Sequence, residues 1–304
     1  MYDTIIVGGG PGGVSAGIYA ARKKMKALLI TDSFGGQSIV SDDIQNWVGT
    51  KSISGLELAK ALEEHLRAYD GIEIVDDDRV AMVSKLEGGF RVKTNKGREY
   101  ETRTLVLSSG SRRRRMGVPG EDKFDGKGVA FCATCDAPLF KGKVVAVVGG
   151  GNAGLETVID LLPYAEKIYL LERGEMLRGD AVTQDKVKAS LKVELITKAE
   201  VQEVLGDSFV NGLRYKDTRT GEIKKLELQG VFVEIGAVPN SDFVKDVVEL
   251  DKFGAIVVDA RTMMSKTPGI WAVGDVCDTP YKQNNIAAGD AVKAILNIGE
   301  YLAK

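Results

Sequence analysis

Near its N-terminus the chain reads Thr4-Ile5-Ile6-Val7-Gly8-Gly9-Gly10-Pro11-Gly12-Gly13. A short apolar run leads directly into a glycine cluster, which is typical of a buried strand that turns sharply into a helix. The cluster matches G-x-G-x-x-G at Gly8, Gly10 and Gly13. The match is weak evidence alone, but here a second apolar run follows and an acidic residue, Asp32, lies roughly twenty residues after the glycines, as the complete dinucleotide-binding pattern requires.

The same pattern returns in the middle of the chain. The apolar run Val144–Val148 leads into a second G-x-G-x-x-G at Gly149, Gly151 and Gly154, and another apolar run precedes the acidic Glu172. In such a motif the first glycine permits the turn, the second lets the backbone approach a pyrophosphate, and the third lets helix and strand pack closely. The helix N-terminus faces the phosphates with free N–H groups. Two repeats therefore predict two dinucleotide sites.

Composition excludes several other classes of protein. A length of 304 residues suggests about two domains. Lys plus Arg number 41 against 43 Asp plus Glu, for a net charge of −2, so we expect no nucleic-acid partner. No apolar run reaches the ~18 residues of a membrane span, and no basic segment precedes the first apolar residues. Three cysteines are too few for a disulfide framework, so we expect a cytoplasmic protein.

The chain between and after the repeats predicts an α/β protein with an interrupted first unit. A capping box at Ser54 and Glu57 predicts a helix to about Tyr69. Short strands are expected over 72–109, a loop over 110–128 and a return linker at 236–240. Strand sequence over 223–235 closes the second unit, and an amphipathic helix covers 284–301. We therefore expect two Rossmann-like domains, the second inserted into the first, with boundaries at 1–113, 114–241 and 242–304.

One face of the 54–69 helix is predicted to be buried. Leu56, Ala59, Leu62 and Leu66 follow helical spacing and would face the core.

A pair of cysteines stands just before the second repeat, in Cys132-Ala133-Thr134-Cys135-Asp136. This spacing indicates either half of a metal site or a redox disulfide. A structural zinc site needs four ligands, and the other candidates are Cys277 and the lone His65, so we expect no metal. Nucleotide sites beside the pair supply electrons, which favours a redox disulfide. Cys277 is interpreted as structural.

These residues resemble the low-molecular-weight thioredoxin reductases. The resemblance covers essentially the whole chain and is carried by the cysteine segment and by the stretches 34–37, 44–47, 118–121 and 269–275. Several stretches, at 138–143, 234–240 and 280–283, are closer to the flavoprotein component of alkyl hydroperoxide reductase. That protein carries an additional N-terminal thioredoxin-like region, which we expect to be absent here.

The resemblance implies FAD in the split unit and NAD(P)H in the inserted one. For FAD it implies the pyrophosphate at Gly8, Gly10 and Gly13, the flavin near Gly36, Gln37, Asn46 and Gln283, a hydroxyl or phosphate region at Asp275, and the adenosine ribose at Asp32, where a plain loop acid is an equal alternative. NAD(P)H would occupy Gly149, Gly151, Asn152 and Gly154, with Glu156 near the nicotinamide. The cofactor-binding set also includes Pro11, Gly35, Val80, Gly110 and Gly236.

The resemblance also implies the course of the reaction. Cys135 would face the flavin, Cys132 would attack the disulfide of a thioredoxin- or glutaredoxin-like partner, and Asp136 would donate a proton. One disulfide cannot face both at once, so relatives rotate the two domains, and 110–128 and 236–242 are the expected hinges here. A homodimer is expected from the family.

The choice of nicotinamide cofactor is where the chain departs from the thioredoxin reductase pattern. Those reductases carry a basic cluster that binds the 2′-phosphate of NADPH. Here Glu172 stands at the strand end, where it would repel a phosphate and accept a hydrogen bond from a ribose hydroxyl. Arg173 and Arg178 could still pair with a phosphate. We therefore predict that NADH is favoured over NADPH.

A second departure is a run of four arginines, Arg112–Arg115. A charge run of this kind is most often a solvated surface. The alternative is a docking rim for an acidic redox protein.

Other functions remain open at this point. An NAD(P)H oxidase would not need the cysteines, and a reductase of a peroxiredoxin system is a further alternative. A ferredoxin-dependent flavin thioredoxin reductase would have no use for the second glycine motif. A nucleotide sensor would have no use for the cysteine pair.

Overall fold

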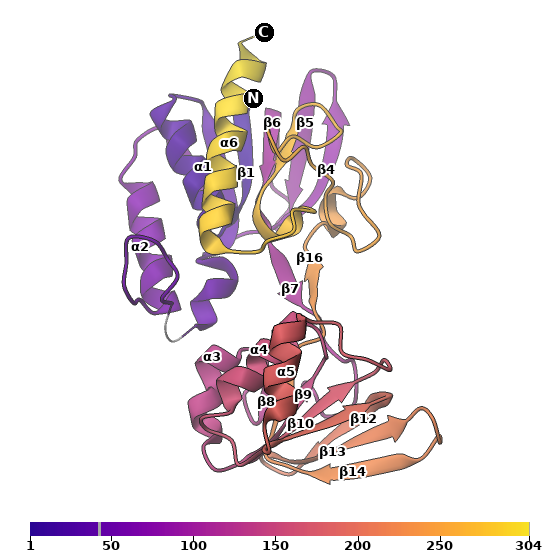
Figure 1. Ribbon diagram of the computed structural model, residues 1–304. Coiled ribbons are helices and arrows are strands. Elements are labelled where there is room, and N and C mark those ends of the chain that lie inside the picture. Colours follow the sequence, from indigo (N-terminus) through magenta and orange to yellow (C-terminus); the bar gives the residue numbers. More distant parts are fainter. Residues whose placement is uncertain (42–43, 304) are drawn as a thin grey trace. The chain divides into compact units, whose positions relative to one another are not determined.

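The computed structural model describes residues 1–41 and 44–303, and the side chains of Val40, Thr134 and Cys135 lie outside its description. The chain forms two compact units, shown in Figure 1. Unit 1 comprises Met1–Arg112 and Val238–Lys304, and unit 2 comprises Arg113–Ala237. The chain thus leaves unit 1 after Arg112 and returns at Val238, close to the boundaries at 113 and 241 that the sequence suggested.

Unit 1 is built on a seven-stranded sheet in the order β3-β2-β1-β6-β5-β4, with β17 also beside β6. Strands β3, β2, β1, β6 and β17 run parallel, whereas β4, β5 and β6 form an antiparallel meander. The bounds are β1 Tyr2–Gly9, β2 Ala27–Phe34, β3 Ile72–Val75, β4 Val80–Leu86, β5 Gly89–Thr94, β6 Glu99–Leu107 and β17 Ile270–Ala272. The carboxyl ends of the parallel strands meet at one edge, where ligands bind in such sheets.

Three helices cover this sheet: α1 Pro11–Arg22, α2 Gly55–Arg67 and α6 Asn284–Leu302, with short 3₁₀ turns η1 Gly36–Val40, η3 Asp242–Val244 and η4 Gly274–Val276. Helices α1 and α6 lie side by side (Figure 1). The core beneath them is apolar, and Ile5, Leu28, Leu105 and Trp271 are fully buried. Such burial is the main driving force for folding. The expected final helix is confirmed.

Unit 2 contains a five-stranded parallel sheet in the order β11-β10-β9-β15-β8 and an antiparallel sheet β12-β13-β14. The strands are β8 Val129–Ala130, β9 Val144–Val148, β10 Lys167–Glu172, β11 Val193–Thr197, β12 Ala199–Gly206, β13 Val210–Asp217, β14 Ile223–Glu227 and β15 Gly230–Val233. The helices are α3 Ala133–Asp136, α4 Asn152–Leu161 and α5 Ala181–Ala189, with the 3₁₀ turn η2 Ala137–Phe140. The expected strand sequence over 223–235 is therefore two strands in different sheets.

The two connecting segments are short strands. β7 Ser111–Arg113 and β16 Ala237–Pro239 pair as a two-stranded sheet where the chain passes from one unit to the other. The 110–128 segment, expected to be a loop, is therefore strand at its start.

Helix α2 begins with the predicted capping box. The Ser54 hydroxyl accepts from the Glu57 N–H, and the Glu57 carboxylate accepts from the Ser54 N–H. The predicted inner face is wrong at one position, because Leu56 is 66% exposed whereas Leu58 is buried. The cause is Gly55: a Cβ there would lie 1.8 Å from the Ser38 carbonyl oxygen, so this side of the helix packs directly on η1 and Leu56 points outward.

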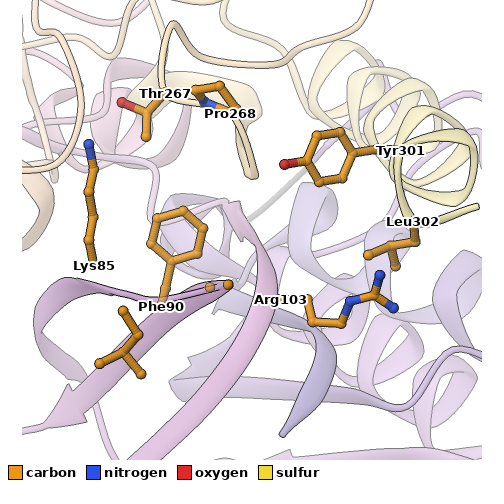
Figure 2. Close-up of a pocket in the computed structure, with 10 residues that line it drawn as sticks. Lys85, Phe90, Arg103, Thr267, Pro268, Tyr301 and Leu302 are labelled. Carbon is orange, nitrogen blue, oxygen red and sulfur yellow. The ribbon is translucent and has the colours of Figure 1, made fainter. Parts of the chain in front are cut away.

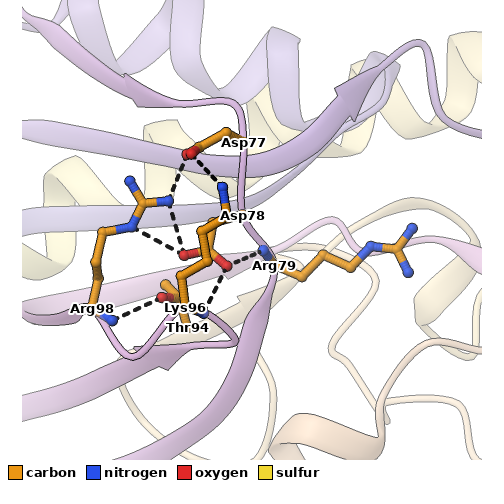
Figure 3. Close-up of polar contacts among 6 residues, drawn as sticks. All are labelled: Asp77, Asp78, Arg79, Thr94, Lys96 and Arg98. Carbon is orange, nitrogen blue, oxygen red and sulfur yellow. Dashed lines mark hydrogen bonds and ion pairs between the residues drawn. The ribbon is translucent and has the colours of Figure 1, made fainter.

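A buried carboxylate holds the meander of unit 1 together. Asp78 accepts from the backbone N–H groups of Arg79 and Lys96 and from the guanidinium of Arg98 (Figure 3). Arg98 also pairs with the neighbouring Asp77, which is exposed.

Within the part of the chain that the structure describes, no helix is long and apolar enough to cross a membrane.

The two neighbouring aspartates should differ sharply in their effect on stability. Asp78→Ala removes the buried acceptor shared by two backbone N–H groups and the Arg98 guanidinium, which is costly, so we expect the thermal midpoint to fall by several degrees. Asp77→Ala removes an exposed ion pair, which contributes little, so its midpoint should stay close to that of the wild type. Thermal unfolding followed by circular dichroism checks both, and equal effects of the two variants would contradict the assignment.

Candidate functional site

The first glycine turn has the geometry of a pyrophosphate cradle. Gly8 has a φ of +112°, in the region that favours glycine, and a Cβ on Gly13 would lie 1.8 Å from the Gly8 carbonyl oxygen. Gly10 differs, because a Cβ there would meet only the Gly36 Cα at 3.9 Å. The outer glycines thus pack the turn against the helix that Pro11 opens, and the middle glycine faces open space. The residues present fit an approaching phosphate.

A polar cluster forms at the same edge of the sheet. Gln37 on η1 donates through Nε2 to the Ser111 Oγ at 2.9 Å and to the Asp275 Oδ2 at 3.1 Å. Ser111 also donates to Asp275 at 3.3 Å. The structure thus brings together Gln37 and Asp275, which lie far apart in the sequence. Ser111 was not among the predicted site residues, because a single serine carries no sequence signal.

A second contact joins the loop after η1 to the start of α6. Asn46 donates to the Gln283 Oε1 at 3.1 Å, and Asn285 donates to the Asn46 carbonyl oxygen at 2.6 Å. Asn46 and Gln283, which were both expected near the flavin, therefore lie together. Asn285 was missed by the sequence analysis.

The other residues that were expected near FAD lie on separate elements of unit 1. Asp32 is exposed on β2 and pairs with Arg79. Val80 follows Arg79 as the first residue of β4. Gly35, with a φ of +89°, precedes η1, and a Cβ there would lie 2.5 Å from the Ala59 Cβ.

The second glycine turn repeats the geometry of the first. A Cβ on Gly154 would lie 1.8 Å from the Gly149 carbonyl oxygen, whereas a Cβ on Gly151 would meet nothing within 4 Å. Gly151 is the N-cap of α4, and Asn152 is the first helical residue. Glu156 lies exposed on the same helix. The outer glycines again pack the turn, and the middle one leaves room for an anion at the helix N-terminus.

Glu172 ends β10 as predicted and is buried. Its carboxylate accepts from the Gly150 N–H at 2.8 Å and from the Gly174 N–H at 2.6 Å. Arg178 approaches the same carboxylate at 3.6 Å, and Arg173 pairs with Glu200. The acid is therefore part of the turn that the second glycine motif forms.

A further carboxylate, Glu234, lies at the carboxyl ends of the parallel strands of unit 2 and was missed by the sequence analysis. It directly follows β15, and its side chain is only 6% exposed. Thr157 on α4 donates to one carboxylate oxygen at 3.2 Å, and Arg113 donates to the other at 3.3 Å. Burial raises its pKa to about 7, Arg113 and Thr157 lower it in part, and Glu156 raises it further. A charged residue directly after an apolar strand was the available signal.

The cysteine segment lies in unit 2. Cys132 is the N-cap of α3, is disulfide-bonded, and accepts from the Asp136 N–H at 3.1 Å through its carbonyl oxygen. The side chain of Cys135 lies outside the described part of the chain. Cys277 is free and buried, and its thiol donates to the Gly274 carbonyl oxygen. Burial raises the pKa of this thiol, which keeps it protonated and unreactive, as a structural role requires.

Three arginines of the 112–115 run contact other residues of the chain. Arg112 contacts Asn240 and Asp242. Arg115 contacts Asp122 and Asp125 and lies over the Phe131 ring. With Arg113 on Glu234, three of the four charges are already compensated, which argues against a free basic rim for docking.

A glycine with positive φ directly precedes each of the two connecting segments. Gly110 has φ +64° and accepts from the Asn240 N–H, and Gly236 has φ +99° and accepts from the Arg114 N–H. A Cβ at either glycine would meet nothing within 4 Å, so backbone conformation, and not space, calls for glycine there.

A pocket of about 390 Å³ also occurs in unit 1 (Figure 2). It is lined by Lys85, Phe90, Arg103, Thr267 and Tyr301, among others. None of the predicted site residues lines it. Arg103 lies between Thr102 and Thr104, which pair with Tyr2 and Thr4 at the start of β1, so the pocket is at the end of the parallel strands opposite to the glycine turn.

The raised pKa of Glu234 predicts how stability changes with pH. The unfolded chain loses this proton near the ordinary value of 4.5, and the folded chain loses it only near 7, so the stabilising contribution is complete below pH 4.5 and lost as the pH rises to 7. Glu234→Gln should remove this loss, which amounts to at most about 3 kcal/mol. Urea unfolding across this pH range measures it.

The exposed Glu227→Gln is the matched control, since its side chain is 76% exposed. This control should keep the wild-type pH profile. If the Glu234→Gln variant also keeps the wild-type pH profile of stability, the environment described for Glu234 is wrong.

Comparison with known proteins agrees with this geometry. A family model described as "Pyridine nucleotide-disulphide oxidoreductase" matches residues 2–291. A component of the alkyl hydroperoxide reductase of Pseudomonas putida is 44% identical over the full chain, which spans 58% of that relative's length. An NADH dehydrogenase of Bacillus subtilis is 41% identical, with 59% of its length covered. The chain therefore spans less than two thirds of these curated relatives.

Solved structures match along their whole length. The thioredoxin reductase of Lactococcus lactis aligns with a TM-score of 0.82 and 30% identity, covering 100% of this chain and 99% of that one. The thioredoxin reductase of T. acidophilum aligns with a TM-score of 0.80 and 35% identity at the same coverage. The expected resemblance and α/β fold class are confirmed, and the chain belongs to the pyridine nucleotide-disulphide oxidoreductases.

Proposed function

We propose that the chain moves electrons from NAD(P)H through FAD and a Cys132–Cys135 disulfide to the disulfide of a thioredoxin- or glutaredoxin-like protein. In balance, NAD(P)H, a proton and the partner's disulfide give NAD(P)⁺ and a dithiol. The observation that carries the proposal is a disulfide-bonded Cys132 in the same unit as the second of two glycine turns, each of which fits a pyrophosphate.

The relatives' names support this proposal. Thioredoxin reductases share the fold over the whole chain, and a component of an alkyl hydroperoxide reductase is a close relative. A partner in a peroxide-removing chain is therefore favoured. The homodimer is expected from the family resemblance, and the cytoplasmic location is expected from the cysteine content.

FAD, when bound in unit 1, supplies the chemistry that takes up a hydride from a nicotinamide and delivers electrons to a disulfide. The chain's own part is to hold and orient. Gly10 leaves room for the pyrophosphate, and the Gln37–Asp275–Ser111 cluster presents hydrogen-bonding groups at the same edge. Asp136, which follows the cysteine segment, would hold the proton that the thiolate needs.

The connecting segments support a change of arrangement during turnover. Gly110 and Gly236 each mark one crossing, and glycine tolerates the large backbone rotations of a hinge. Exposure of Cys132 to a partner would use this freedom.

An NADH preference is part of the proposal. The proposal assigns to the buried Glu172 carboxylate, which accepts from two backbone N–H groups, the role of accepting from a ribose hydroxyl and repelling a 2′-phosphate. The Bacillus subtilis relative is named as an NADH dehydrogenase, which agrees.

Anaerobic titration tests the electron path. Purified protein titrated with NADH, and separately with NADPH, should take up two reducing equivalents beyond those of the flavin, as followed by flavin absorbance. The Cys132→Ser/Cys135→Ser double variant should lose this extra uptake, because the disulfide that accepts it is gone. Cys277→Ala is the matched control and should keep it.

Other outcomes would favour other functions. Reduction of the flavin without extra uptake, with rapid peroxide formation in air, would indicate an NAD(P)H oxidase. Reduction by neither nucleotide would overturn the nicotinamide assignment and favour a ferredoxin or another donor.

The cofactor preference has its own test. Glu172→His combined with Gly174→Arg should raise kcat/KM for NADPH relative to NADH by at least about tenfold, because it replaces a repelling charge by attracting ones. Glu172→Ala separates the loss of repulsion from the gain of attraction. Unchanged steady-state kinetics with both nucleotides would refute the role of Glu172.

A further inference from the structure

Glu234 is a buried carboxylate beside the second glycine turn. Its N–H donates to the Val148 carbonyl oxygen at 2.8 Å, and its own carbonyl oxygen would lie 2.2 Å from a Cβ on Gly149. Its backbone therefore packs directly against the first residue of the motif. Its side chain lies under α4, the helix whose N-terminus the motif opens, through the hydrogen bond from Thr157.

Few charges face this carboxylate. Among the described residues of unit 2, Arg113 of β7 and Glu156 of α4 are the charged groups that act on it, and they act in opposite directions. Arg113 is 43% exposed, so water weakens its attraction for the carboxylate. Because burial and Glu156 oppose this single cation, the pKa of Glu234 stands near 7 and both protonation states are accessible.

The described part of this unit contains no histidine, the side chain whose ordinary pKa lies nearest to neutrality. The chain has a single histidine, His65, which lies on α2 of unit 1. Cys132 is in a disulfide and does not titrate. Glu234 is the described carboxylate of this unit whose pKa burial brings near 7.

A dinucleotide would bring further negative charge to this turn. Its pyrophosphate would bind at the N-terminus of α4, and an ionised Glu234 in the same low-dielectric region would oppose that binding. Binding and protonation must then favour each other by linkage.

We propose that Glu234 takes up a proton when NAD(H) binds at the second glycine turn, so that nucleotide affinity falls as the pH rises through neutrality. The inference rests on the proposed function, because it needs a nucleotide in unit 2. It assigns a positioning role to Glu234. The residue sets the charge of the site, and its carboxylate links Thr157 of α4 to Arg113 of β7 by accepting a hydrogen bond from each.

Calorimetric titration of the oxidised holoenzyme with NAD⁺ tests the proposal. NAD⁺ is the probe because it lacks the titrating 2′-phosphate of NADP⁺. Between about pH 6 and about pH 8.5 the affinity should fall about fivefold, the size expected for one partly screened charge. Repeating the titration in buffers of different ionisation heat should reveal proton uptake.

Variants separate this role from a purely structural one. Glu234→Gln keeps the shape and an acceptor for Thr157, so its affinity should stay at the low-pH value of the wild type and show no proton uptake. Arg113→Met removes the cation that favours the ionised form, so the fall in affinity should move to higher pH. This second variant keeps Glu234 itself and therefore tests the proposal even if Glu234→Gln folds poorly.

Asp217→Asn is the matched control. Asp217 is also a buried carboxylate of unit 2, but hydrogen bonds from Arg219 hold its pKa well below the ordinary range. Its variant should keep the wild-type pH profile. A wild-type affinity that does not change with pH, or a Glu234→Gln variant that keeps the fall, would overturn the inference. Failure of NAD⁺ to bind at any pH would instead contradict the proposed function.

Discussion

The structure depends on one close contact that occurs twice. In each unit the third glycine of the motif packs onto the carbonyl oxygen of the first, so closely that a Cβ on Gly13 or Gly154 would lie 1.8 Å from that oxygen. This contact sets the angle at which α1 and α4 leave their strands, and it directs each helix N-terminus toward the space at the middle glycine. The parallel sheets then place other strand ends at the same edge. Both proposed nucleotide sites follow from this single steric constraint.

The two glycine turns have different side chains around them. The acid of the first repeat, Asp32, is exposed and pairs with Arg79, whereas the acid of the second, Glu172, is buried and binds the backbone of its own turn. Unit 1 supplies neutral hydrogen-bonding groups around Asp275, while unit 2 adds a second buried carboxylate, Glu234. The same local pattern therefore serves two sites of different charge, and this difference underlies the two cofactor assignments that we propose.

Much of the fold was predictable because its signals are local. A strand, a glycine turn and a helix lie within some thirty residues of each other, and the capping box at Ser54 is contained in four consecutive residues. One error arose where a distant segment decides: Leu56 points to solvent because Gly55 packs onto Ser38. The arginine run is partly exposed, as expected of a solvated surface, but the acids that pair with it could not be identified from the sequence. Periodicity and charge counts contain no information about such partners.

The sequence by itself determined the two dinucleotide-binding repeats, the cysteine pair between them and the enzyme class that these imply. Tertiary structure alone decided which side chains share an environment: it joined Gln37 to Ser111 and Asp275, and it buried Glu234 between Thr157 and Arg113. The physical reason is range. Backbone propensities and glycine sterics act between neighbours in the chain, whereas burial and the electrostatics of a carboxylate depend on every group that folding brings near it.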